Sequence, residues 1–152
     1  MLAAGFAARL AKSLGAHLGL IHVFDVPTLS LWANVDLQMK NDIRNQAEKT
    51  LTEISERIRE VCDIVPEFHI VEGIPEEEIL RAVSEDSRIM MVVTGRGGLA
   101  TEKKSHPRLR RASGRFSVKL SEHLQIPLLI VPPDVNTAHL CSAMVDFDMP
   151  RE

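Results

Sequence analysis

A glycine-rich turn and the basic stretch that follows it are the residues of this sequence best suited to bind a ligand. The turn is Thr94-Gly-Arg-Gly-Gly98, directly after the apolar run at residues 89–93. In open α/β sheets, ligands bind beyond the carboxyl ends of the strands, near the point where the strand order changes. Residues 96–115 carry seven Lys or Arg side chains and a single acid. We therefore expect a ligand site at this turn.

The other residues capable of chemistry have simpler structural explanations. His22 lies in an apolar run, and the remaining histidines have no nucleophile or metal partner at ligand spacing. Residues 76–78 are three glutamates at a predicted helix start, where the helix dipole favours acids. Cys62 and Cys141 are far apart and belong to no CxxC motif, which indicates a reduced, cytoplasmic protein without a disulfide framework. No Ser-His-Asp order or G-x-S-x-G elbow is present, so no catalytic residue and no metal site are predicted.

The composition excludes several classes of protein. The chain has 152 residues, of which 45% are hydrophobic and 26% charged, a balance typical of one globular domain. The net charge of -3 and the aromatic content of 4% speak against a nucleic-acid partner. The apolar runs at residues 89–93 and 128–131 are far shorter than the about 20 residues that a membrane span requires.

Alternating helices and strands are predicted to position the glycine-rich turn. Helices are indicated by apolar residues at every third or fourth position, and strands by short continuous apolar runs. Gly15 is expected to end the first helix in a left-handed turn, and Ser113-Gly114 to open the last one. This alternation predicts an α/β fold with a parallel sheet. The predicted order is helix 2–14, strand 18–24, a loop with Trp32 followed by a long helix with its apolar pattern at 43–61, strand 68–71, helix 75–83, strand 89–93, helix 113–124 and strand 126–131.

With this order of elements, the chain resembles the universal stress protein family over most of residues 1–133. The resemblance implies a three-layer α/β sandwich, similar to the adenine nucleotide alpha hydrolases, with a five-stranded parallel sheet of strand order 3-2-1-4-5. It also implies a cytoplasmic stress-response module that forms a homodimer, often through the last strand. The matching segments are residues 10–16, 20–23, 71–76, 91–98, 114–118 and 126–132.

The segment that resembles the first strand of the family stands at the other end of this sequence. The family begins with a strand that ends in an acidic residue, and here residues 139–150 resemble it, with Asp148 where serine is common. Residues 1–133 are thus expected to form a domain that lacks its N-terminal strand, and residues 134–152 a tail that supplies it. A circular permutant, a piece of a tandem protein and a strand donated to a partner all fit, as does a loose tail. The linker of about six residues reaches roughly 20 Å, which makes a return within one chain tight.

The resemblance also implies an ATP site, because nucleotide-binding members of the family carry the pattern G-x2-G-x9-G-[S/T] after the fourth strand. Glycines let backbone N–H groups approach phosphates, and a helix N-terminus favours anions. Gly95 and Gly98 match the first two glycines and Gly114 the third, with fifteen residues in place of nine. Arg115 replaces the hydroxyl residue. The remaining matched positions are Ser117 for a second hydroxyl, Thr94 at the adenosine end, Val23 for a backbone contact to the base and, if the tail is the first strand, Asp146 for the ribose.

Because the spacing and the hydroxyl depart from the pattern, several interpretations stay open. Residues 96–115 form a phosphate-gripping flap for ATP and an accompanying Mg²⁺, or a solvated loop, or a contact for RNA or an acidic protein. The corresponding functions are a non-catalytic stress-response module that binds ATP, a regulatory domain of a tandem protein or transporter that binds no nucleotide, and a member that hydrolyses ATP slowly. The first is preferred, and enzyme activity is expected to be absent or weak.

Overall fold

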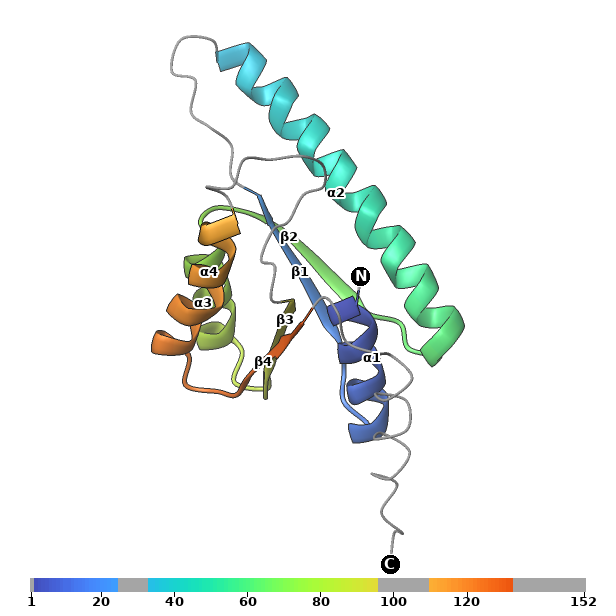
Figure 1. Ribbon diagram of the computed structural model, residues 1–152. Coiled ribbons are helices and arrows are strands. Elements are labelled where there is room, and N and C mark those ends of the chain that lie inside the picture. Colours follow the sequence, from blue (N-terminus) through green and yellow to red (C-terminus); the bar gives the residue numbers. More distant parts are fainter. Residues whose placement is uncertain (1, 25–32, 96–109, 133–152) are drawn as a thin grey trace, which may run out of the picture.

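The computed structural model describes residues 2–24, 33–95 and 110–132, and helices and strands alternate through these ranges (Figure 1). The predicted alternation is therefore confirmed. The elements are α1 (Leu2–Leu14), β1 (Gly19–Phe24), α2 (Ala33–Cys62), β2 (Glu67–Glu72), α3 (Pro75–Glu85), β3 (Val92–Gly95), α4 (Arg110–His123) and β4 (Leu128–Val131).

The C-terminus of α1 confirms the predicted glycine cap. Gly15 follows the last helical residue with a φ of 62°, in the left-handed region that favours glycine. Its N–H donates to the Lys12 carbonyl at 3.2 Å, and the Ala16 N–H donates to the Ala11 carbonyl at 2.8 Å. These two bonds form a Schellman motif and satisfy carbonyls that the end of the helix leaves without partners. The motif turns the chain from α1 into β1.

Three predicted elements have wrong bounds. Strand β4 begins at Leu128 rather than at residue 126. Helix α4 begins at Arg110, because arginine and alanine before Ser113 are good helix formers, so Gly114 lies inside the helix and does not open it. Strand β3 runs from Val92 to Gly95 rather than over 89–93, because its length is set by pairing with the four residues of β4.

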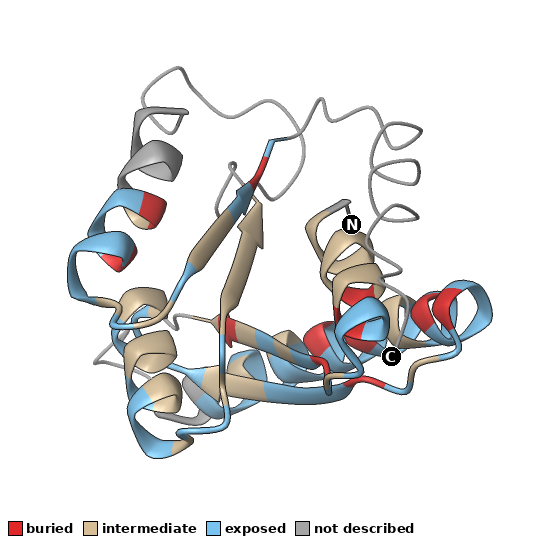
Figure 2. Cartoon of the chain, turned by 90° about the horizontal axis from the view of Figure 1, so that it is seen from below, coloured by how far each residue is buried: buried red, intermediate tan, exposed pale blue. Residues whose placement is uncertain are grey.

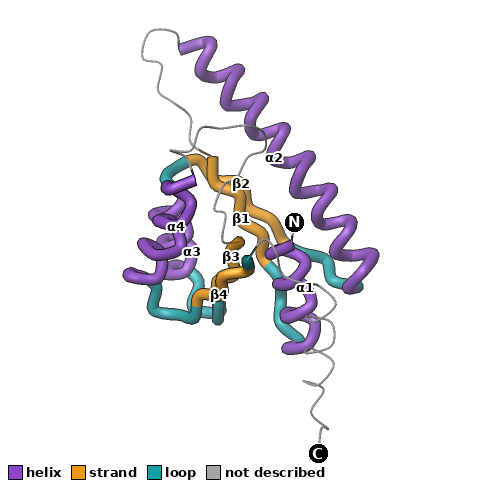
Figure 3. Tube along the Cα trace, in the orientation of Figure 1, coloured by secondary structure: helices purple, strands orange, loops and turns teal. Residues whose placement is uncertain are grey.

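The strands form two parallel pairs. β1 pairs with β2 from Gly19↔Glu67 to Phe24↔Glu72, and β3 pairs with β4 from Val92↔Leu128 onward. Within the described ranges these are two separate two-stranded sheets. Helices α1 and α2 lie on one side of the strands, and α3 and α4 on the other, which is the expected three-layer arrangement (Figures 1 and 3). The five-stranded order stays a prediction, because residues 139–147 lie outside the described part of the chain.

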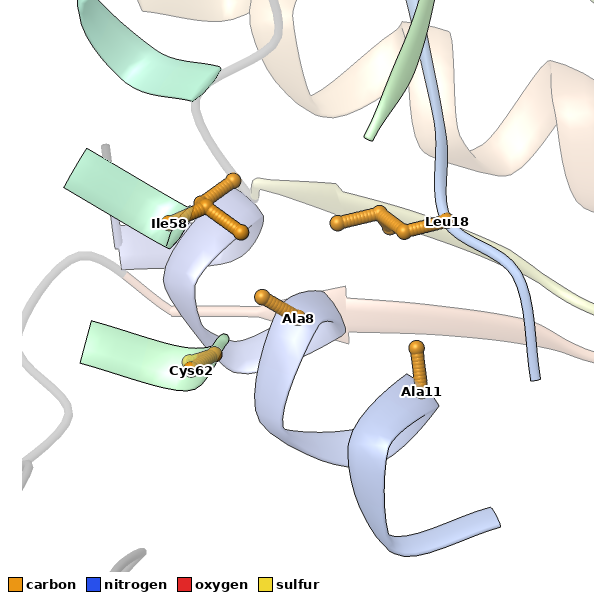
Figure 4. Close-up of a cluster of buried hydrophobic side chains, with 5 residues drawn as sticks. All are labelled: Ala8, Ala11, Leu18, Ile58 and Cys62. Carbon is orange, nitrogen blue, oxygen red and sulfur yellow. The ribbon is translucent and has the colours of Figure 1, made fainter. Parts of the chain in front are cut away.

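The main buried cluster lies where α1, α2 and the start of β1 meet (Figure 4). Alanines on α1 face α2 there, and their small side chains let the helices approach closely. Buried residues gather on α1, α2 and α4, while the strands are mostly half-buried or exposed (Figure 2). β1 is thus less buried than its apolar sequence predicts. The members of the cluster are Ala8, Ala11, Leu18, Ile58 and Cys62.

Candidate functional site

Three of the predicted site residues lie at the carboxyl ends of β1 and β3. Val23 is the penultimate residue of β1, and Thr94 and Gly95 end β3. The strands of both pairs run toward the same edge of the molecule (Figure 1). These residues therefore lie at the edge where parallel α/β sheets bind ligands.

The backbone of Val23 points away from β2. The carbonyls of Leu18 and Phe24, at the two ends of β1, accept hydrogen bonds from the β2 side at 3.0 Å each. Backbone groups alternate in direction along a strand, so those of Gly19, Ile21 and Val23 point to the opposite edge. Val23 is also buried. Its backbone can therefore serve a ligand or a neighbouring strand, but not β2.

The same alternation directs the backbone of Gly95 away from β4. The Val92 N–H donates to the Pro127 carbonyl at 3.0 Å, so Val92 and Thr94 face β4. Val93 and Gly95 consequently present their backbone groups to the other edge of β3. The strand order 3-2-1-4-5 with its first strand absent from residues 1–133 already implied such edges on β1 and β3. The observed pairing adds which residues of each strand face them.

Nothing in the described structure requires a glycine at position 95. Its backbone is not left-handed, and an added Cβ would meet only the Ala3 Cβ, at an ordinary contact distance of 3.9 Å. Glycine in a strand often marks a bulge, a tight bend or a place where a ligand or another backbone approaches closely. Gly95 ends β3, and its missing side chain leaves room for such an approach.

Helix α4 contributes a buried hydroxyl without a partner. Ser117 is 5% exposed, and its Oγ has no hydrogen-bond partner in the described part of the chain. Helical serines commonly bond the carbonyl four residues earlier, and an unsatisfied buried hydroxyl costs free energy. Gly114 lies three residues before Ser117 and so on the same side of the helix.

The revised start of α4 changes the role available to Gly114. The unpaired N–H groups of a helix belong to its first turn, and α4 begins at Arg110, so Gly114 lies inside the helix rather than at its start. The assignment of Gly114 to a phosphate contact stays a prediction. Gly98, Asp146 and the side chain of Arg115 lie outside the described residues.

The charged pair with a clear pKa shift lies away from this edge. Two side-chain hydrogen bonds from Arg88, at 2.9 and 2.8 Å, and one from its backbone lower the pKa of Asp86 to about 2. This pair sits between α3 and β3, at the amino end of the strand.

In the described ranges, no group of three His, Cys, Asp or Glu side chains could hold a metal ion. The helices seen there also include none with the length and hydropathy to cross a membrane.

Comparison with known proteins gives a family and a fold. The sequence model of the universal stress protein family matches residues 1–132. The universal stress protein UspA from Lactobacillus plantarum is 19% identical, with a TM-score of 0.65 over 84% of this chain and 87% of that chain. The hypothetical protein MJ0577 is 20% identical, with a TM-score of 0.64 over 88% and 90%.

A third solved structure is a universal stress protein in complex with cAMP. It is 17% identical, with a TM-score of 0.54 over 86% of both chains. At these identities the likeness concerns the fold alone. A sequence comparison with curated proteins finds no match.

Proposed function

Because this chain belongs to the universal stress protein family, we propose that it is a stress-response regulatory module that binds ATP at the carboxyl ends of β1 and β3. The observation that carries the proposal is Gly95. It is a strand glycine that the packing of the fold does not need, and its backbone faces an edge without a strand partner in the described residues. Such a position suits close contact with a ligand.

The residues at this edge fit the parts of an adenine nucleotide. The backbone of Val23 would contact the base, Thr94 would lie at the adenosine end, and Gly95 with Gly98 would admit the phosphates. The orphaned Oγ of Ser117 would find a partner in a phosphate oxygen. In this proposal Arg115 supplies charge where relatives have a hydroxyl, and Asp146 holds the ribose. ATP, with Mg²⁺ on its phosphates, would act here as a bound signal, and no hydrolytic step is assigned.

We also propose an oligomeric state and a cellular location for the protein. Ile130 on β4 is 42% exposed although it lies in an apolar strand, which suits a homodimer formed along the last strand. The free, buried Cys62 suits a reducing compartment, and we place the protein in the cytoplasm. A regulatory domain that binds no nucleotide is the second candidate. The observation that favours it is the position of Gly114 inside α4 rather than at the helix start, where the family pattern has its last glycine.

Thermal unfolding with and without ATP tests the proposal. ATP at a hundredfold excess over its Kd stabilises the folded state by about 2.7 kcal/mol. At this chain length that raises the Tm by about 5–10 °C. No shift at millimolar ATP would reject the ATP site and favour the second candidate.

A pair of glycine variants tests whether Gly95 lies against the bound nucleotide. The Gly95→Ala variant should have the same Tm as the unaltered protein or a higher one when ATP is absent, because the new Cβ makes only an ordinary contact. It should bind ATP at least about tenfold more weakly, because the Cβ blocks the close approach of the nucleotide. Gly19→Ala on β1 is the matched control, because its Cβ meets nothing within 4 Å and it lies at the opposite end of the strand. Equal ATP shifts in both variants would contradict the assignment of Gly95.

A further inference from the structure

The side of β2 that faces away from β1, named here the β2 edge, pairs with no strand in the described residues. The Glu67 N–H donates to the Leu18 carbonyl at 3.0 Å, so the odd-numbered residues of β2 direct their backbone groups toward β1. The backbone groups of Phe68, Ile70 and Glu72 alternate with these and point outward. An unpaired row of N–H and C=O groups is a template for another strand.

The sequence of β2 leaves this edge unprotected. Edge strands that stay single are commonly guarded by a lysine, a proline or a β-bulge within the strand. Residues 67–72 read Glu-Phe-His-Ile-Val-Glu and pair with β1 in unbroken register, so β2 has none of these devices. Phe68 on the strand is 42% exposed, and Val61 and Val65, in the segment that leads into it, are 62% and 79% exposed. The β2 edge is thus suited to pair with a further strand.

Ion pairs within the chain show which side chains of β2 share a face. The Glu72 carboxylate lies 2.6 Å from Lys40 Nζ on α2, so the even-numbered side chains of the strand lie on the face toward α2. The Glu67 carboxylate lies 3.6 Å from His69 Nε2, and both side chains belong to the opposite face. Phe68 therefore lies on the α2 face.

A second copy of β2 that runs antiparallel matches this arrangement. With a two-fold axis at His69, Phe68 of each copy lies directly opposite Ile70 of the other, so apolar side chains meet on the α2 face. On the other face, Glu67 of each copy lies opposite Val71 of the other. No glutamate of this strand lies opposite another glutamate, so no repulsion between carboxylates opposes the pairing. The chain thus carries a complementary partner for its own edge.

The backbone groups fit the same register. Phe68 and Ile70 both point outward, so each pair that they form across the axis exchanges two N–H···O=C bonds. The two copies of His69 lie between these pairs, in a non-hydrogen-bonded position, because the backbone of His69 faces β1. A two-fold axis perpendicular to the sheet also keeps the α2 faces of both copies on the same side.

We propose that β2 pairs antiparallel with β2 of a second copy of this chain, about a two-fold axis at His69, and so joins the two β1–β2 pairs into one sheet. A contact built on six-residue strands is small, so we expect association in the micromolar range. The β2 edge belongs to a different strand pair from β4. The inference therefore rests on neither the proposed nucleotide site nor the proposed homodimer along β4.

Disulfide trapping tests the position of the axis. His69→Cys is made in a Cys141→Ser background, in which the remaining Cys62 is buried. Opposed residues in a non-hydrogen-bonded pair have Cα atoms about 4.5 Å apart, which suits a disulfide. Glu67→Cys is the matched control, since its side chain is on the same face and more exposed, 79% against 57% for His69. In the proposed register the two copies of residue 67 lie about 13 Å apart.

We expect the His69→Cys variant to form disulfide-linked dimers at least about tenfold faster than the Glu67→Cys variant. Equal rates would overturn the proposal, because random collision favours the more exposed position. When Phe68→Cys and Ile70→Cys chains are mixed, disulfides between the two variants should exceed those within either one at least about fivefold. The about twofold excess expected from random pairing would overturn the register.

Hydrogen exchange in the unaltered protein keeps the proposal falsifiable if a variant does not fold. The amides of Phe68 and Ile70 should exchange at least about tenfold more slowly at about 1 mM protein than at about 20 µM, measured relative to those of His69 and Val71, which face β1. Fast exchange at both concentrations would show an open edge and overturn the proposal. Equally slow exchange at both would show that the edge is covered within one chain, which also overturns it.

Discussion

Replacing either of two glycines with alanine, one inside α1 and one directly after it, should change the stability of the protein in opposite directions. Gly5 lies inside α1, and a Cβ there meets nothing within 4 Å. Gly15 caps the same helix with a φ of 62°, and its Cβ would also meet nothing. Space is therefore equal at the two sites, and only the backbone conformation differs. The pair isolates the free energy of the left-handed turn that leads from α1 into β1.

The expected magnitudes follow from that conformation. Alanine inside a helix is more stable than glycine by about 0.5–1 kcal/mol, so Gly5→Ala should stabilise the protein by that amount. Alanine in the left-handed region costs about 1–2 kcal/mol, so Gly15→Ala should destabilise it by about 1 kcal/mol after the loss of unfolded-state entropy is included. The two variants should differ in Tm by about 4–8 °C.

Urea unfolding followed by far-ultraviolet circular dichroism measures both free energies. Gly15→Asn serves as a further control, because asparagine tolerates the left-handed region and should lose less stability than alanine. A Gly15→Ala variant as stable as the unaltered protein would refute the left-handed cap. A destabilised Gly5→Ala would show instead that position 5 is not an open helical site.

Two other groups of residues give predictions that involve hydrogen bonds. The Ser117→Ala variant should have a free energy of unfolding in urea that is equal to that of the unaltered protein or higher by up to about 1 kcal/mol, because the change removes a buried Oγ that has no partner among the described residues. A loss of stability larger than that of the control variant Ser121→Ala would reveal a partner for Ser117. The depressed pKa of Asp86, about 2 against 3.8, means that its stabilising contribution is present above about pH 4 and is lost as the pH falls toward 2. Arg88→Gln should return the pKa of Asp86 toward 3.8 in a carboxyl NMR titration, and an unchanged pKa would contradict the role of Arg88.

The parts of the fold that local chemistry controls were predictable. The glycine cap of α1 and the proline at the start of α3 are set by backbone geometry within a few residues. The start of α4 was not predictable, because residues 110–113 can continue a helix and Ser113 is also a good cap. The ends of β3 were not predictable either, since pairing with β4 selects which part of a long apolar run is a strand.

By itself the sequence determined the class of the fold, the order of its elements and the turn at Gly95–Gly98 as the place to look for a ligand. Periodicity and cap residues encode these features locally. Only the tertiary structure decided that β1 pairs with β2 and β3 with β4, and that the buried Ser117 Oγ has no hydrogen-bond partner among the described residues. Pairing and burial depend on residues far apart in the chain, so no local pattern contains them. The basic stretch is a candidate for phosphate contact because its end continues into α4, one turn before the orphaned Ser117.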